Sequence, residues 1–131
     1  MAEHPNVALL RKGYDAFGKG DMATLTGVFA EDVVWHLPGR HPVSGVHKGR
    51  DAVFAAFAKF GQLSGGTLHI ELHDVLANDE HTVAVNRGTA SRQGRELSLL
   101  GVDVYHVTNG RITEFWSFSE DQRLDDEFWS S

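Results

Sequence analysis

The sequence predicts one α+β domain, with helices first and a mainly antiparallel sheet after them. Up to about residue 61, apolar residues recur at the three- and four-residue spacing of a helix face. From Thr67 onward they alternate with a period of two, which is typical of strands. Short turns such as Asn109-Gly110 join these strands and favour antiparallel pairing. No linker or repeat interrupts the 131 residues, so we expect a single domain over 1–131.

Three helices are predicted in the N-terminal half. The first begins near Pro5 and ends at the glycines 18 and 20, and the second begins at the N-cap residue Asp21. The third begins at Asp51 and ends at Gly61. Their apolar stripes are Val7, Leu10, Tyr14 and Phe17; Leu25, Val28 and Phe29; and Val53, Phe54, Phe57 and Phe60.

The strands are predicted from alternation and from the turns between them. A short strand over 33–37 follows a turn at Glu31-Asp32 and stops at Pro38, and residues 39–49 read as a loop. Turns at 78–80, 93–94 and 109–110 then separate the long strands of the C-terminal half. With the helices on one side, this order predicts an antiparallel sheet covered on one face.

Composition narrows the function classes. The net charge of −6 argues against a nucleic-acid partner, because phosphate binding needs clustered Lys and Arg. No apolar run approaches the roughly 20 residues of a membrane helix, so no membrane partner is expected. The chain has no cysteine, and its N-terminus lacks the pattern of a signal peptide, which fits a cytoplasmic protein.

Asp103 lies in the middle of an apolar strand, Leu97 to Val107. An ionised carboxylate is seldom buried without a partner, because removing its charge from water costs several kcal/mol or forces protonation. Either this face of the strand lines a wet cavity or the pKa of Asp103 is raised. Both alternatives indicate a functional site.

Tyr14 lies on the apolar stripe of the first helix and is expected to point toward the same layer as Asp103. A tyrosine hydroxyl and a neutral carboxyl group that converge on one cavity can bind a single carbonyl oxygen, as an oxyanion hole does. The structural alternative is that Tyr14 is ordinary core and that Asp103 bonds a neighbouring side chain. The spacing favours neither.

Apolar residues occupy both faces of the strand that holds Asp103. Leu97, Leu99 and Tyr105 share its face, and Leu100, Val102 and Val104 occupy the opposite one. An antiparallel sheet with helices on one side normally has polar residues on the other. A second copy of the chain would cover the additional apolar face, so we expect a homodimer.

Short motifs in a fixed order carry a resemblance to a known superfamily: residues 14–17 and 20–21 on the helices, 29–32, 49–52, and 109–114 near the end. In this order they resemble the NTF2-like superfamily, which includes ketosteroid isomerases, nuclear transport factor 2 and SnoaL-like polyketide cyclases. The resemblance covers nearly the whole chain. It implies a cone-shaped fold with three helices on a curved sheet, and it leaves function open among enzymes, binding proteins and adaptors.

The resemblance places two residues of a steroid isomerase site. In those enzymes a Tyr on the first helix and an Asp on a late strand bind the enolate, and Tyr14 and Asp103 match these positions. The carboxylate base expected before the proline is absent, because Leu37 precedes Pro38. Isomerisation by the usual mechanism is therefore not expected.

Other branches of the superfamily imply other roles. In the cyclases a carboxylate removes a proton beside a carbonyl, a role open to Asp103, Glu120 or Asp121. The epoxide hydrolase branch needs an Arg where this chain has Gly101. Arg87 on the neighbouring strand could instead pair with Asp103 and lower its pKa.

The aromatic residues favour an apolar pocket for a small molecule, with core packing as the structural alternative. The predicted lining residues are Phe17, Trp35, Phe54, Phe57, Arg87, Tyr105, Trp116 and Phe118. The C-terminal Leu124, Phe128 and Trp129 would cover the mouth of the pocket or lie across a partner subunit.

No metal or other cofactor is predicted. His69 and His73 lie roughly 13 Å apart on one strand, at about 3.3 Å per residue, which is too far for both to bind one ion. For the trio His36, His41 and His47 no spacing rule applies, and a polar loop is the preferred interpretation. The alternative is that His41 or His47 rims the pocket and acts as an acid or base near neutral pH.

The leading hypothesis is a SnoaL-like protein that binds a small, largely apolar carbonyl compound and catalyses enolisation, isomerisation or cyclisation. Asp103 would be the acid or base, and Tyr14 would donate a hydrogen bond to the substrate oxygen. The alternatives are a non-catalytic ligand-binding module and a protein-interaction adaptor on the same fold.

Overall fold

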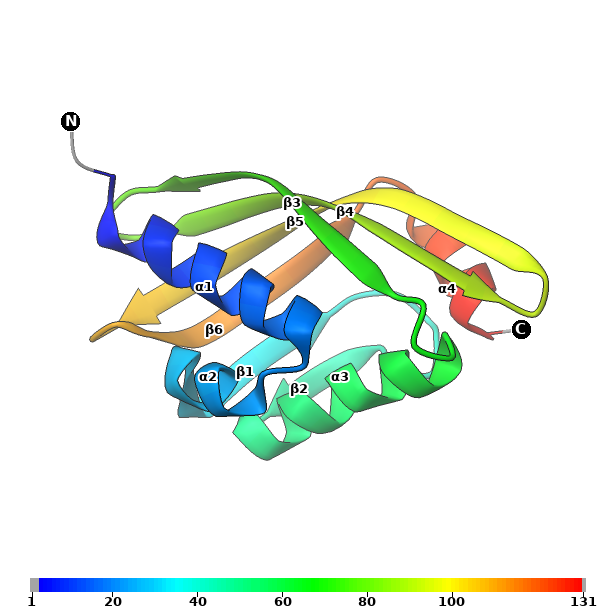
Figure 1. Cartoon of the computed structure of the whole chain (residues 1–131), viewed down its shortest axis with the longest axis horizontal. Coiled ribbons are helices and arrows are strands. Elements are labelled where there is room, and N and C mark those ends of the chain that lie inside the picture. Colours follow the sequence, from blue (N-terminus) through cyan, green and yellow to red (C-terminus); the bar gives the residue numbers. More distant parts are fainter. Residues whose placement is uncertain (1–2, 131) are drawn as a thin grey trace.

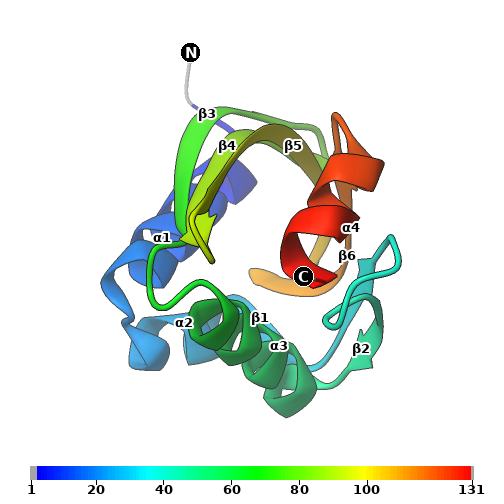
Figure 2. The same ribbon diagram turned by 90° about the vertical axis from the view of Figure 1, so that its right-hand side faces the viewer.

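The computed structural model describes residues 3–130, which form a curved six-stranded sheet with helices on its concave side (Figures 1 and 2). The strand order is β2-β1-β6-β5-β4-β3. In chain order the elements are α1 Pro5–Lys19, α2 Met22–Val28, β1 Phe29–Leu37, β2 Gly45–Lys48, α3 Arg50–Leu63, β3 His69–Ala77, β4 Thr82–Arg92, β5 Arg95–Thr108, β6 Arg111–Ser119 and α4 Gln122–Ser130.

The sheet is mainly antiparallel, as predicted. Four of its five strand pairs are antiparallel, and only β1 and β6 run parallel. The parallel pair arises because α3 and four strands separate β1 from β6 in the chain, whereas short turns join β3 to β4, β4 to β5 and β5 to β6. The long strands β4 and β5 bend across the middle of the sheet and form the curved wall that Figure 2 shows.

The limits of α1 follow directly from its sequence. Pro5 is pre-organised for the first turn, and Gly20 closes the helix in the left-handed conformation, at φ 67°. The fully buried stripe contains Val7, Leu10 and small residues at 13 and 16. Tyr14 is half-buried beside this stripe, so its polar end is directed toward the space between helix and sheet.

The prediction for residues 29–32 was wrong. Phe29 begins β1 instead of ending the second helix, and Glu31 and Asp32 belong to the strand rather than to a turn. The register of β1 against β6 shifts between Phe29 and Val34, so a bulge accommodates the exposed acidic pair. Residue types alone predict a turn here, because two consecutive exposed acidic residues are more typical of turns than of strands.

Two further elements were not predicted. The segment 39–49 contains the short edge strand β2, where Val46 and His47 pair with β1. The C-terminal residues form α4, whose buried side chains are Phe128 and Trp129. In the described part of the chain, no helix is both long and apolar enough to span a membrane.

Gly39 joins the β1–β2 loop closely to α4. Its φ is 98°, and a Cβ atom there would lie 2.2 Å from Oδ1 of Asp126 and 2.3 Å from Nε2 of Gln122. The backbone conformation therefore favours glycine, and a methyl group there would displace the side chains of Asp126 and Gln122, which bond each other at 2.8 Å. This approach fixes the first turn of α4 over the end of β1.

We predict that Gly39→Ala lowers the free energy of unfolding by about 1–3 kcal/mol more than Gly45→Ala does, because the added methyl group overpacks the loop against α4. Gly45 is a matched control, since it also has a positive φ (136°) but has no atom within 4 Å of its Cβ position. Urea unfolding of both variants measures the difference. Equal losses would show that only the backbone conformation matters at Gly39.

Candidate active site

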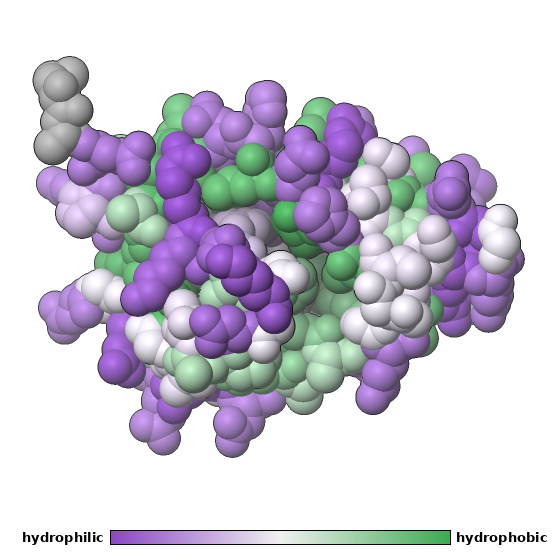
Figure 3. Space-filling view, viewed as in Figure 1, coloured by the Kyte–Doolittle hydropathy of each residue, from purple (hydrophilic) through white to green (hydrophobic). Residues whose placement is uncertain are grey.

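A cavity of about 210 Å³ lies between the helices and the concave face of the sheet. The face in Figure 3 is hollowed near its centre, with apolar residues around the hollow. Helices α1, α3 and α4 and strands β1, β4, β5 and β6 all contribute side chains to the wall. The polar or ionisable residues among those that line it are Tyr14, Asn86, Asp103, Tyr105, Ser117, Ser119, Gln122 and Asp125; Trp35 and Trp129 also carry indole N–H groups.

Tyr14 and Asp103 meet in this cavity. The Tyr14 hydroxyl donates a hydrogen bond of 2.5 Å to Oδ2 of Asp103, so α1 and β5 are joined through two polar groups. The Tyr105 hydroxyl lies 2.8 Å from that of Tyr14 and 3.4 Å from the same carboxylate oxygen. Tyr105 comes two residues after Asp103 on β5, and this spacing directs both side chains to the same face.

Asn86 completes the network from β4. Its Nδ2 donates to Oδ2 of Asp103 at 3.0 Å and approaches the Tyr14 hydroxyl at 3.4 Å. Gly101 pairs with Asn86 across the strands, and a Cβ at Gly101 would lie 3.0 Å from Oδ1 of Asn86. The glycine thus leaves the space that the buried amide occupies.

Burial raises the pKa of Asp103 above its ordinary value, and hydrogen bonds from Tyr14, Ser117, Asn86 and Tyr105 oppose this rise. Burial also raises the pKa of Tyr14 well above its usual value, with the Asp103 carboxylate adding to the effect. The same causes raise the pKa of Tyr105. Both phenols therefore remain protonated and can donate to an oxygen atom in the cavity.

The walls of the cavity are aromatic. Phe17, Trp35, Phe57 and Tyr105 line it, whereas Phe54 does not and packs against Phe29 and Phe57 behind the wall. Trp35 and Tyr105 each stack on Phe115, with centroids 5.1 Å apart. The Trp35 indole N–H donates to Ser117 Oγ at 2.9 Å, so its ring is fixed at the base of the cavity.

Arg87 does not pair with Asp103, and this alternative was wrong. Arg87 lies in register with Leu100 on the outer face of the sheet, where its guanidinium donates to Ser98 Oγ at 3.0 Å. Asp103 instead lies in register with Ala84, on the concave face. A displacement of three positions along β4 changes the face, so the ion pair is geometrically excluded.

Two predicted aromatic residues lie on the outer face as well. The Trp116 ring stacks on His36 at 5.0 Å and meets His106 edge-on, and it does not contribute to the cavity. Phe118 reaches the rim of the cavity, but 55% of its surface is exposed. Alternation along β6 explains both, because Phe115 and Ser117 take the inward positions.

The remaining acid candidates have structural partners at the ends of elements. Glu120 accepts a hydrogen bond of 2.7 Å from the Leu100 amide, and Asp121 accepts one of 3.0 Å from the Leu124 amide, where it caps α4. Leu37 lines the cavity at the position where a carboxylate base would be expected. Glu120 and Asp121 are exposed and do not line the cavity.

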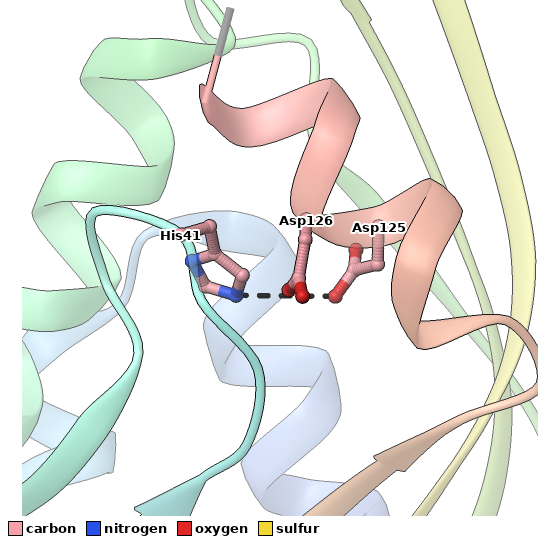
Figure 4. A group of neighbouring side chains, drawn as sticks. All are labelled: His41, Asp125 and Asp126. Carbon is pink, nitrogen blue, oxygen red and sulfur yellow. Dashed lines mark ion pairs between the residues drawn. The ribbon is translucent and has the colours of Figure 1, made fainter.

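The three histidines of the predicted loop have different environments. His36 bonds Glu114 at 2.7 Å on the outer face, and His47 Nε2 lies 2.7 Å from the Val43 carbonyl oxygen. His41 is buried beside Asp125 and Asp126 of α4 (Figure 4). Within residues 3–130, His41, Asp125 and Asp126 form the only group of His, Cys, Asp and Glu side chains that could hold a metal ion, with ligand atoms within 4.8 Å of one another.

Sequence reasoning missed Asn86 and Asp125. For Asn86 the sequence shows only that residues 84 and 86 share one face of the strand, and the register of β4 against β5 decides that this face is the concave one. For Asp125 there was no signal in the sequence. It faces the cavity only because α4 folds back over the end of β1.

We predict that the stability of the wild-type protein, relative to Asp103→Asn, decreases as the pH rises through the raised pKa of Asp103. The folded state binds this proton more tightly than the unfolded state does. The contribution to stability is therefore complete below the ordinary pKa of Asp and is lost as the folded carboxyl group ionises. Denaturant titrations of both proteins over the acidic pH range measure it, and a pH-independent difference would contradict the raised pKa.

Comparison with known proteins identifies the family. Residues 10–115 match the model of the SnoaL-like domain. An uncharacterised Mycobacterium tuberculosis protein, Rv0034, is 37% identical over 131 residues, covering 99% of this chain and all of the relative.

Solved structures agree with this match. Bal32a, from a soil-derived mobile gene cassette, is 40% identical with a TM-score of 0.92 over 95% of this chain and 96% of its own. IdmH of Streptomyces antibioticus, a proposed polyketide cyclase, shares the fold at 19% identity and a TM-score of 0.77, over 95% of this chain and 99% of its own. The resemblance seen in the sequence is confirmed, and the chain belongs to the SnoaL-like family of the NTF2-like superfamily.

Proposed function

We propose that this protein binds a small, largely apolar carbonyl compound in the cavity and catalyses proton transfer at a carbon next to the carbonyl group. The reaction class is enolisation, with isomerisation or ring closure as its outcome. The observation that carries the proposal is the Tyr14–Asp103 contact at the polar base of an otherwise apolar cavity.

The network offers one site for an oxygen atom. Tyr14 and Tyr105 keep their protons, and burial favours the neutral form of Asp103. A carbonyl oxygen that enters would replace Asp103 Oδ2 as the acceptor of the Tyr14 hydroxyl proton and would accept a second hydrogen bond from the protonated Asp103 carboxyl group. In an apolar cavity these bonds strengthen as negative charge develops on the oxygen, which is how enolate formation is accelerated.

The alternative with support of its own is a non-catalytic binding module. The aromatic walls formed by Phe17, Trp35 and Phe57 suit a planar apolar ligand whether or not it reacts. An adaptor function would use the outer face and would not depend on Tyr14 or Asp103. Measurements of activity and binding on the same variants distinguish the enzyme, the binding module and the adaptor.

We also infer that the protein is a homodimer that pairs through the outer apolar face, defined here by Leu76, Leu100, Val102, Val104, Trp116 and Phe118. Leu76 and Phe118 each expose 55% of their surface, and Leu100 exposes 37%. Strand register places these side chains on one continuous face. Covering such a face removes apolar area from water, which stabilises association.

We predict that the wild-type protein accelerates exchange of the α-protons of 2-tetralone with solvent deuterium, followed by NMR. Tyr14→Phe should reduce this rate by about 10²–10³-fold, the usual cost of losing one donor to a developing oxyanion. Asp103→Asn should also reduce it, because an amide N–H is a weaker donor than a carboxylic acid. Asp32→Asn, on the exposed part of β1, is the matched control and should retain the wild-type rate.

Binding of 2-naphthol, a planar analogue of the enol, is measured alongside by fluorescence. Binding that depends on Tyr14 and Asp103 without any exchange would support the binding module against the enzyme. If 2-naphthol does not bind to the cavity and no exchange occurs, the proposed function fails for this compound class. Unchanged behaviour of both variants would favour the adaptor.

We predict that Phe118→Asp converts a dimer to a monomer in sedimentation velocity, because a charge on the outer apolar face would lose its hydration on association. Met22→Asp is the control, since Met22 is 46% exposed on α2 and lies outside that face. A wild-type protein that sediments as a monomer would overturn the inference.

A further inference from the structure

Asp125 is a second carboxylate that faces the cavity. Of the residues that line it, only Tyr14, Asp103, Tyr105 and Asp125 have ionisable side chains. The first three are joined in one hydrogen-bonded network on α1 and β5. Asp125 comes from α4, and among residues 3–130 its hydrogen bonds go to Gln122 and Trp129 rather than to that network, so it is available for a different task.

The Asp125 carboxylate is held by its own helix. Oδ1 accepts a hydrogen bond of 3.0 Å from the indole N–H of Trp129, one turn later, and Oδ2 lies 3.4 Å from Nε2 of Gln122. Burial raises the pKa of Asp125, and the nearby charge of Asp126 adds to the rise, while the Trp129 bond opposes it. The result is a fixed carboxylate with increased affinity for a proton.

The ring of His41 faces the carboxylates of Asp125 and Asp126 (Figure 4). Its side chain is completely buried, and its Nε2 has no hydrogen-bond partner among residues 3–130. Nε2 lies 3.9 Å from Oδ2 of Asp125. Nδ1 accepts a bond of 3.2 Å from the Val43 amide, so in the neutral ring the proton is on Nε2 and points toward the carboxylates.

The surroundings of His41 keep its ring neutral. Burial lowers the pKa of His41, and the Asp126 carboxylate partly opposes this change. From α3, the Phe60 ring packs at 5.8 Å, and Lys59 donates to the Pro42 carbonyl oxygen at 3.2 Å. The groups of α4 that face the ring are thus two carboxylates, and a buried N–H directed at them is electrostatically favourable.

A metal ion fits this cluster less well than a proton does. A metal on Nε2 would need the lone pair of that nitrogen, so the ring proton would have to move to Nδ1. Nδ1 already accepts the Val43 amide proton, and that hydrogen bond would be lost. The local hydrogen bonding therefore favours a neutral imidazole whose Nε2–H faces Asp125 and Asp126.

We propose that Asp125 is the general base of this cavity and that His41 is a positioning residue behind it. This rests on the proposed function, since it supplies the proton acceptor that Leu37 does not provide. The Asp125 carboxylate takes the proton from the carbon next to the carbonyl group. The C–H electron pair becomes the new C=C bond, and the carbonyl π electrons move to the oxygen held by Tyr14 and Asp103. The Asp125 carboxyl group then exchanges this proton with solvent, and transfer of the solvent-derived proton to carbon completes the exchange and regenerates the carboxylate.

The test uses the full chain, 2-tetralone exchange in deuterated buffer and 2-naphthol binding. Asp125→Asn is expected to lower the exchange rate by about 10²–10⁴-fold, the usual contribution of a positioned base, and to retain 2-naphthol affinity. Asp32→Asn is the matched control: it removes the same charge from an exposed position on β1 that does not line the cavity, and it should keep the wild-type rate.

The role of His41 is tested by the pH profile. His41→Leu removes the N–H behind Asp125, so the pKa that governs the rate should rise and the profile should shift to higher pH. His41→Gln places an amide N–H near the position of Nε2 and should restore the profile. A purely structural His41 would lower the unfolding free energy of His41→Leu without moving the profile.

The outcomes separate this proposal from the proposed function. Wild-type exchange in Asp125→Asn, with a loss in Tyr14→Phe, would overturn Asp125 as the base and leave the proposed function standing. Absence of both exchange and 2-naphthol binding in the wild type would overturn both. Stoichiometric bound metal, together with exchange that is lost on chelation, would overturn the proton-based role of His41.

Discussion

The hydrogen bond between Tyr14 and Asp103 is the contact on which the organisation of the cavity depends. A carboxyl group in an apolar wall must be hydrogen-bonded, because an unsatisfied polar group in a protein interior costs about 1–3 kcal/mol and a charge costs more. Asp103 meets this requirement with donors from α1, β4 and its own strand. The result joins three elements far apart in the chain, and it leaves donor groups directed at the space that a ligand would occupy.

Small residues make this arrangement possible. Ala84 lies opposite Asp103 on β4, and Gly101 leaves room for the Asn86 amide. A larger side chain at either position would occupy the space in which the polar groups converge. Gly39 serves a similar purpose, since it lets α4 approach the end of β1 and bring Asp125 to the wall. The small residues Ala84, Gly101 and Gly39 therefore contribute to the shape of the cavity together with the aromatic residues.

The fold could be predicted because its signals are local and repeated. Caps and periodicity defined α1, and alternation with short turns defined the long strands. The predictions were wrong where one local sequence pattern is compatible with two structures. Exposed acids at 31 and 32 form a bulge within β1 rather than a turn. The face of Arg87 was also misjudged, because strand register decides it and the sequence of one strand does not.

The sequence by itself determined the α+β class, the family, and the presence of a carboxyl group on an inward strand face with a tyrosine on the helix above it. These follow from periodicity and from the cost of burying a charge, which act on neighbouring residues. Only the tertiary structure decided that Asn86 joins them, that Arg87 and Trp116 lie outside, and that Asp125 and His41 face each other beside the cavity. Those relations depend on strand register and on how α4 folds back, and both are set by contacts between segments far apart in the chain.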